Sequence, residues 1–448
     1  MSQPLDALTK SLLQAAKSAG ADSADAKAIR ATSVSVDVRA GTLEQAERSE
    51  GVDIGLRVFV GHRSAIVSAS DTSLRTIEEM AERAVAMAKE APEDPFSGLA
   101  DPDQLATHWN VDALELVDPT AEPTPQAMQD DAAQAEAAAL AVKGVSQVQS
   151  ASAGYAAHAT HFSTSNGFNA GYSRTDRGLS CVAIAGSGTS MERDYDGDGR
   201  IFQSDMRAPG DIGQTAGERA VARLDARKPP TGAFPVLFDE RISSSLIGHL
   251  LGAINGSSIS RGASFLRDAM GEPVLPDHLS LIEDPHRPRA SGSRPFDGEG
   301  LPTARRMIVE NGVLQGWTLD LATARKLELA PTGNAARGTS SGPSPSNWNI
   351  ELTQGTDSRD DLIREMGTGL LVTSMIGSTI NPNTGDYSRG AAGLWVENGE
   401  ITHTINECTI AGNLRDMLRN MRPANDARTH LSRVVPSLLV PGMTLAGA

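Results

Sequence analysis

At 448 residues the chain is too long for one ordinary hydrophobic core, so two or three domains are expected. A formal net charge of −16 and an aromatic content of only 4% argue against a direct nucleic-acid partner, which needs clustered lysine and arginine and stacking side chains. Two distant cysteines, no signal-peptide pattern, and no apolar run near the ~20 residues of a membrane-spanning helix predict a cytoplasmic protein without a membrane partner.

Residues 1–110 are predicted to form an N-terminal α/β unit. Apolar residues at helical spacing indicate a first helix within residues 5–20. Alternating apolar residues then predict three half-buried strands, at residues 34–38, 52–60 and 65–69. A second helix is expected at residues 74–88, between a capping Asp71 or Thr72 and Pro92.

Residues 120–228 are predicted to form a middle α/β unit. The preceding segment, 92–125, is rich in Pro, Asp and Glu and indicates an exposed connection. The unit is expected to hold helices at its two ends and strands between them, at residues 126–143, 145–163, 168–175, 179–186 and 212–224, with a turn at Asn166-Gly167. Because helix, strands and helix occur twice in the chain, an ancient duplication is an open alternative.

Residues 231–448 are predicted to form a β-rich C-terminal domain. A strand at 234–238 and a helix at 241–254 begin it, and the sequence Val-Glu-Asn-Gly, at 309–312 and again at 396–399, predicts two hairpins. Residues 339–346 have the composition of a flexible surface loop. The expected fold class is α+β, with N-terminal helix and antiparallel-sheet units followed by this turn-rich domain.

A polar corner in the C-terminal domain is the candidate contact site for substrate or for another subunit. Asp386, Tyr387, Ser388 and Arg389 follow a turn signal at Asn383-Thr-Gly385, where side chains and free backbone groups could meet a ligand. The alternative is that this block only folds tightly, with its glycines in turns and its charges in local pairs.

An acidic motif in the middle unit imitates a calcium loop. Asp194, Asp196 and Asp198 take the spacing of oxygen ligands and Gly199 takes the turn position. The preceding residues indicate strand rather than helix, and Asp205 stands where a bidentate glutamate is needed. A strand end with an acidic turn therefore explains the motif better, and calcium binding between Asp194 and Asp205 stays open.

No histidine forms a recognisable hydrolase motif. His249 lies on the predicted helix 241–254, but Leu250 follows it where a zinc peptidase of the His-Glu type has glutamate. His158 and His161 lie three apart on a predicted strand and so point to opposite faces. No Gly-x-Ser-x-Gly elbow occurs in a strand-turn-helix context. Packing or solvent contact is the favoured role of these histidines.

The chain resembles the TldD/PmbA family, on its PmbA (TldE) side. The strongest likeness is C-terminal, at residues 385–393, 395–401 and 409–414. Further segments match family landmarks in the same order, at residues 165–168, 191–195, 295–300 and 324–327. The resemblance therefore extends over nearly the whole chain.

The resemblance implies a subunit without a metal site or catalytic residues of its own. In TldD the comparable helix carries His-Glu-x-x-x-His and a cysteine near the C-terminus completes the zinc site, whereas residues 246–256 and 437–447 here lack these groups. A TldD-type partner would hold the zinc, and the pair would cleave unfolded peptides. We expect an exposed strand edge in the C-terminal half to bind such peptides through main-chain hydrogen bonds.

Two other functions stay open at this point. The chain could be a metal-independent hydrolase, or a regulatory peptide-binding protein of the modulator-of-DNA-gyrase type without peptidase activity. The acidic balance favours a protein partner over DNA itself. Homodimer formation and the natural substrate are also open.

Overall fold

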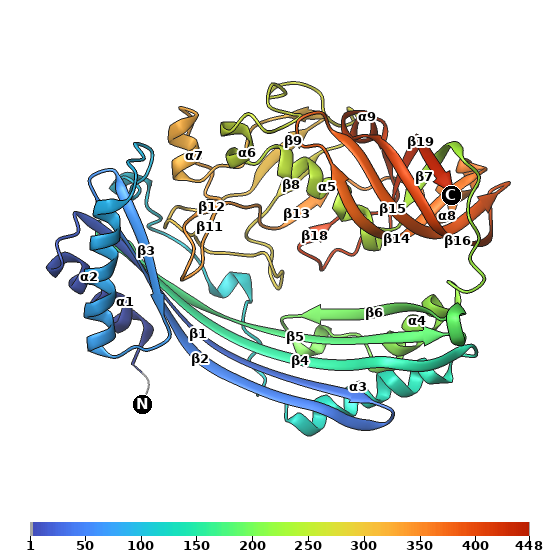
Figure 1. Ribbon diagram of the computed structural model, residues 1–448, viewed down its shortest axis with the longest axis horizontal. Coiled ribbons are helices and arrows are strands. Elements are labelled where there is room, and N and C mark those ends of the chain that lie inside the picture. Colours follow the sequence, from blue (N-terminus) through green and yellow to red (C-terminus); the bar gives the residue numbers. More distant parts are fainter. Residues whose placement is uncertain (1–2, 448) are drawn as a thin grey trace.

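The structure, a computed structural model, describes residues 3–447 and has two parts (Figure 1). A long, curved antiparallel sheet backed by helices contains residues up to Val221. A β-rich part made by residues 231–447 lies above the concave face of that sheet (Figure 1). The predicted α+β class is confirmed.

The first sheet has six strands in the order β3-β2-β1-β4-β5-β6, and all neighbours are antiparallel. The central pair is β1 and β4, which join the N-terminal and middle units over the register from Asp25↔Thr164 to Val38↔Ala151. The two units therefore share one continuous sheet. Its strands are β1 (Ser23–Arg39), β2 (Thr42–Val60), β3 (Arg63–Ala69), β4 (Val145–Thr164), β5 (Asn169–Ala185) and β6 (Glu192–Arg200).

Four helices cover the convex face of this sheet (Figure 1): α1 (Leu5–Ser18), α2 (Leu74–Glu90), α3 (Pro125–Ala141) and α4 (Pro209–Val221). Even-numbered residues of β1 face them, because Ala24, Ala26 and Ala28 pack with α1 and α2, whereas Val34, Val36 and Val38 pack with α3. Side chains alternate along a strand, so the odd-numbered residues of β1 face the C-terminal part. Each half of the sheet has the element order helix, three strands, helix.

Two strand predictions in the middle unit were wrong. β5 is one strand where two were predicted, because Gly178 continues the ladder opposite Gly154 instead of breaking it. The acidic motif is also strand rather than turn, because β6 runs through Asp194, Asp196 and Asp198 and pairs with β5 throughout. Glycine within a long, well-paired strand does not end it when both neighbouring strands supply hydrogen bonds.

The segment 92–125 is more than the exposed connection that was predicted. It contains two short 3₁₀ turns, η1 (Pro102–Gln104) and η2 (Asp112–Leu114), and four buried apolar side chains, those of Ala100, Ala106, Leu114 and Leu116. Arg325 of the C-terminal part donates to the carbonyl of Leu99 at 2.6 Å. The segment thus packs between the two parts of the molecule.

The main C-terminal sheet closes on itself. Its strands follow the order β16-β15-β14-β7-β19, β16 also pairs with β19, and β17 attaches to β19. The bounds are β7 (Gly232–Phe238), β14 (Gly369–Ile380), β15 (Asp386–Glu397), β16 (Glu400–Asn413), β17 (Arg422–Pro423) and β19 (Leu438–Gly447). The predicted hairpin turn at Asn398-Gly399 is confirmed by positive φ angles of 52° and 79°.

A second C-terminal sheet has the order β10-β9-β8-β13-β18, and β11 pairs with β12 beside it. Their bounds are β8 (Leu281–Glu283), β9 (Arg306–Glu310), β10 (Val313–Leu314), β11 (Ala335–Ala336), β12 (Ser344–Pro345), β13 (Ile350–Leu352) and β18 (Arg433–Val434). The helices of this part are α5 (Glu240–Ala253), α6 (Gly256–Ser260), α7 (Leu321–Lys326), α8 (Arg359–Met366) and α9 (Leu414–Asn420). The predicted hairpin at 309–312 is present, joining β9 to β10.

Residues 339–346 do not form the free surface loop that was predicted. Gly55 of β2 approaches so closely that a Cβ there would lie 2.1 Å from the carbonyl oxygen of Thr339. Ser344 and Pro345 pair with β11. The loop therefore packs against the first sheet. Over residues 3–447, no helix has both the length and the apolarity needed to cross a bilayer.

Candidate functional site

Helix α5 brings His249 to the predicted polar corner. The helix follows β7, and the carboxylate of Asp239 caps it by accepting the Arg241 backbone N–H at 3.1 Å. Leu246 and Leu250 bury one face in the C-terminal core. The ring of His249, which directly precedes Leu250, contacts the Tyr387 ring edge to face, with centroids 5.8 Å apart. Its Nε2 is buried without a hydrogen-bond partner in the described part of the chain.

The four predicted site residues do not point the same way, because they alternate along β15. Tyr387 is 3% exposed, and its hydroxyl donates to the Met375 sulfur at 3.3 Å. Arg389 lies on the same face of the strand and donates from Nε to the Gly377 carbonyl at 2.8 Å. Burial raises the pKa of Tyr387 to about 12, although the Arg389 charge opposes the rise.

Asp386 and Ser388 lie on the other face of β15. The exposed Asp386 carboxylate accepts from the Thr384 hydroxyl at 2.6 Å and from the Asn413 amide at 3.2 Å. Ser388 stands in the strand ladder between Thr379 and Ala411. The structure therefore groups Tyr387 and Arg389 with His249 and leaves Asp386 in its own turn.

The His249 corner does not fit a zinc site. Burial lowers the pKa of His249, and the nearby Arg389 charge lowers it further. A neutral imidazole can bind metal, but the positive guanidinium beside it repels a cation, and among the described residues no carboxylate or thiolate completes the set. Across residues 3–447, no three His, Cys, Asp or Glu side chains gather closely enough to hold a metal ion.

The acidic motif on β6 does not form a calcium site either. Each carboxylate has a cationic partner: Asp194 pairs with Arg241 at 3.2 Å, Asp196 with Arg219 at 2.7 Å, and Asp198 with Arg200 at 2.9 Å. Carboxylates that are neutralised on an extended strand cannot wrap a calcium ion. Of these three pairs, Asp194–Arg241 joins the two parts of the molecule, and the other two lie within the first part.

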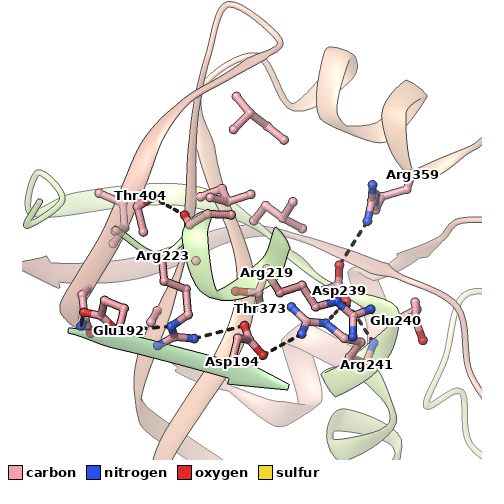
Figure 2. A pocket seen from close by; sticks show the side chains of 18 residues that line it. Glu192, Asp194, Arg219, Arg223, Asp239, Glu240, Arg241, Arg359, Thr373 and Thr404 are labelled. Atoms are coloured by element: carbon pink, nitrogen blue, oxygen red, sulfur yellow. Dashed lines mark hydrogen bonds and ion pairs between the residues drawn. The ribbon is translucent and has the colours of Figure 1, made fainter. Parts of the chain in front are cut away.

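A pocket of about 190 Å³ lies where β6 and α4 of the first part meet the closed sheet (Figure 2). One wall is ionic. Asp194 contacts Arg241 at 3.2 Å and Arg223 at 3.7 Å, and Asp239 contacts Arg359 at 3.3 Å (Figure 2). The opposite wall is largely apolar and comes from the closed sheet: Leu371, Thr373, Ala392, Gly393, Leu394, Ile401 and Ile405.

Sequence reasoning missed this pocket. Its ionic residues come from β6, from α4 and the residues just after it, from the start of α5 and from α8, which are far apart in the sequence and give no joint signal. The one available signal was the spacing of Asp194, Asp196 and Asp198, which places the three carboxylates on one face of a strand. The sequence pattern around these three aspartates instead indicated a strand end with an acidic turn.

Strand β14 links the pocket to the corner. Leu371 and Thr373 line the pocket, whereas Met375 and Gly377 contact Tyr387 and Arg389. β7 pairs with β14 only from Leu370 to Val372, and in the described residues β15 alone pairs with the strand beyond that point. Residues 373–380, here called the β14 edge, thus offer unpaired backbone groups on one side, and Ile376 there is 78% exposed.

Comparison with known proteins gives consistent matches along the chain. Family models described as PmbA/TldA metallopeptidase match in three places: domain 1 at residues 24–88, the central domain at 118–224 and the C-terminal domain at 231–447. The metalloprotease PmbA of Escherichia coli O157:H7 is 38% identical over 95% of this chain and 92% of its own. A PmbA homologue of Haemophilus influenzae is 36% identical over 97% of this chain and 94% of its own.

Solved structures show the same fold. A proposed modulator of DNA gyrase from Bacteroides thetaiotaomicron superposes with a TM-score of 0.91 and 27% identity, covering 99% of this chain and 98% of its own. TldE from Thermococcus kodakarensis superposes with a TM-score of 0.84, covering 98% of this chain and 100% of its own. At 20% identity, the second likeness concerns the fold alone.

Proposed function

Because this chain belongs to the PmbA-type branch of the PmbA/TldD metallopeptidase family, we propose that it is the metal-free subunit of a heteromeric peptidase. A TldD-type partner holds the zinc in this proposal, and the pair degrades or matures unfolded peptides. The pair works in the cytoplasm, where the two buried cysteines, Cys181 and Cys408, remain free thiols.

The surroundings of His249 carry the proposal. A zinc peptidase of the His-Glu type needs two histidines and a glutamate on one helix, so that the metal and its water lie side by side. On α5 the single histidine instead meets the ring of Tyr387, with the charge of Arg389 nearby. This geometry supports a packing role for His249, and the hydrolytic chemistry is therefore assigned to the partner.

The β14 edge is the proposed contribution of this chain to substrate binding. An extended peptide can add to it through main-chain hydrogen bonds, which select for unfolded chains and against folded ones. Arg389 donates to the carbonyl of Gly377, which lies in the β-bulge of β14 between Ile376 and Thr379, and the pocket at Thr373 offers an apolar wall to a substrate side chain. Peptide binding would thus depend little on the amino-acid sequence of the peptide.

The test is cleavage of an unfolded protein by this chain alone, by a TldD-type partner alone, and by the mixture. Each reaction is run with and without a zinc chelator. We expect cleavage only in the mixture without chelator. A mixture with a partner whose catalytic glutamate is replaced by alanine is the matched control, since it should assemble but not cleave.

The two other functions predict different results. Chelator-resistant cleavage by this chain alone would identify a metal-independent hydrolase and contradict the proposal. Binding of an unfolded peptide without cleavage in any mixture would favour a regulatory protein, as in the modulator description of the Bacteroides thetaiotaomicron relative.

A further inference from the structure

A second cavity, of about 100 Å³, lies between the first sheet and the C-terminal part, beside Ala335 and Ala336 of β11. Lys27 of β1 and Thr160 of β4 line it from the sheet, and Arg294, Arg337 and Trp348 line it from the other side. None of these residues belongs to the β14 edge or to the pocket at Thr373. The cavity has no part in the function proposed above.

Two of the three cations at the cavity have no counter-ion. Within the described residues, no carboxylate lies within 4 Å of the Lys27 ammonium or the Arg294 guanidinium. Lys27 donates to the Arg337 carbonyl at 2.6 Å, and Arg294 donates to the Tyr172 hydroxyl at 3.3 Å. Both residues are half-buried, and charges withdrawn from water are ordinarily paired, because an uncompensated charge in a low-dielectric site is costly.

The pKa of Lys27 agrees with this shortage of negative charge. Burial lowers it to about 8, and the charges of Arg337 and Arg294 push it in the same direction. Arg294 also lies over the Trp348 ring, 4.4 Å from its centroid, so its positive charge rests against an aromatic face rather than a carboxylate.

The carboxylates near the cavity are already engaged. Asp25 pairs with both Arg337 and Arg57. Asp297 also lines the cavity, but its oxygens accept the backbone N–H groups of Leu301, Glu299 and Ala335, at 2.9 to 3.0 Å. Asp297 thus brings one negative charge to the cavity wall, but in the described residues neither carboxylate forms an ion pair with Lys27 or Arg294.

Three buried donors on the lining residues are also unpartnered in the described part of the chain. They are the Thr160 hydroxyl, Arg294 Nε and Arg337 Nη2. A cavity of about 100 Å³ exceeds the ~10–15 Å³ that one water needs. Water could fill it, but water would leave Lys27 and Arg294 without an ion-pair partner.

We propose that this cavity binds one small oxyanion, a carboxylate or an inorganic phosphate, between Lys27 and Arg294. Lys27 belongs to β1 and Arg294 to the loop before β9, so the anion joins the first sheet to the C-terminal part. Bound there, it stabilises the packing of the two parts. A carboxylate and a phosphate both present a compact group of negatively charged oxygens, which ammonium and guanidinium groups bind strongly.

The test is calorimetric titration of the full-length chain at pH 7 and constant ionic strength, with inorganic phosphate in one arm and acetate in the other. We expect one saturable site per chain in at least one arm, and a rise in the melting temperature with that anion. Binding in the phosphate arm alone identifies a tetrahedral anion, and binding in the acetate arm identifies a carboxylate.

Lys27→Met and Arg294→Gln should each weaken binding at least tenfold, whereas Lys89→Met, an exposed lysine on α2, should not. Affinity should also fall as the pH rises through 8, where Lys27 loses its proton. Absence of binding in both arms, or unchanged affinity in both cavity variants, would overturn the proposal. If the variants do not fold, crystals of the natural chain soaked in selenate give the answer: an anomalous peak in the cavity supports the site, and peaks only at the surface refute it.

Discussion

The carboxylate of Asp25 forms an ion pair with the guanidinium of Arg337, which lies 312 residues further along the chain, and neither side chain has exposed surface. Arg57 binds the other oxygen of the same carboxylate at 2.6 Å. Asp25 and Arg57 belong to adjacent strands of the first sheet, and Arg337 belongs to the C-terminal part. One buried carboxylate therefore joins the two parts of the molecule.

Replacing Asp25 with asparagine should destabilise the protein by about 3–5 kcal/mol, because both arginines keep their charge and lose their partner. Urea unfolding measures the change. The exposed pair Arg75–Glu79 provides the control, since Arg75→Gln should leave the midpoint unchanged. A double variant, Asp25→Leu with Arg337→Met, should lose less than Asp25→Asn. An equal or greater loss would show that packing, and not charge, sets the cost.

Acid should remove the Asp25 contribution only at low pH. Burial alone would raise the pKa of this carboxyl, but Arg337 and Arg57 outweigh burial and hold it below the ordinary 3.8. Between that lowered pKa and 3.8 the unfolded chain binds more protons than the folded one, so the free energy of unfolding falls as the pH falls. Compared with Asp25→Asn, the natural chain should show an extra loss of stability below pH 3.8, which urea midpoints across pH 2–5 will reveal.

The buried carboxyl of Glu299 should give the free energy of unfolding the opposite dependence on pH. The residue is 5% exposed, and its carboxyl accepts the Leu321 N–H at 2.9 Å. Burial, and then the charge of Asp297, raise its pKa above the ordinary 4.5. Above pH 4.5 the folded state keeps a proton that the unfolded state releases, so stability falls as the pH rises. Glu299→Gln keeps the acceptor and should flatten this slope in urea titrations, whereas Glu310→Gln, at an exposed position, should not.

Gly213 and Gly210 form a matched pair on α4. A Cβ at Gly213 would lie 1.9 Å from the Ala135 carbonyl on α3, whereas a Cβ at Gly210 meets nothing within 4 Å. Gly213→Ala should therefore cost about 1–3 kcal/mol by forcing the helices apart. Gly210→Ala should stay within about 0.5 kcal/mol of the natural chain. Thermal unfolding compares the two, and equal melting temperatures would refute close helix packing as the reason for Gly213.

His249→Phe tests whether this histidine packs or binds metal. The variant keeps an aromatic ring against Tyr387 and removes a buried nitrogen without a partner, so we expect equal or higher stability. Zinc content and peptidase rate of the mixture with a TldD-type partner should not change. Loss of zinc from the assembled variant would identify His249 as a metal ligand and contradict the proposed role.

Arg389→Gln should lower the peptidase rate of the mixture on the order of tenfold, about 1.4 kcal/mol, because the β-bulge at Gly377 would lose its hydrogen bond from Arg389 and loosen. Asp386→Asn should have a smaller effect, since this carboxylate bonds within its own turn. Arg415→Gln, an exposed arginine on α9, is the control. Rates and assembly are measured together. If both corner variants assemble and cleave like the natural chain, the corner has only a structural role.

Local signals in the sequence predicted several helices, turns and strand faces correctly. Asn398-Gly399 takes positive φ at both positions, as the turn chemistry requires, and the helix predicted at 74–88 is present as α2 (Leu74–Glu90). The alternation of Val34, Val36 and Val38 correctly indicated one buried face of β1. These signals succeed because each depends on residues that are close together in the chain.

Relationships between distant residues were beyond such signals. The pairing of β1 with β4 and the ion pair of Asp25 with Arg337 join segments more than 100 residues apart. The polar corner shows the same limit on a smaller scale. Four adjacent polar residues were considered together, but strand alternation buries Tyr387 and exposes Asp386. That division depends on where β15 lies in the sheet, which the local pattern does not contain.

The closed sheet also dictates an order of events during synthesis. β7 (Gly232–Phe238) has β14 and β19 as its two neighbours, and both lie more than 100 residues downstream. The six strands of the first sheet end at Arg200, so that sheet can form while the ribosome is still making the rest. β7 gains one neighbour when residues 369–380 emerge and the other only when residues 438–447 emerge, so the closed sheet is completed at the very end of synthesis.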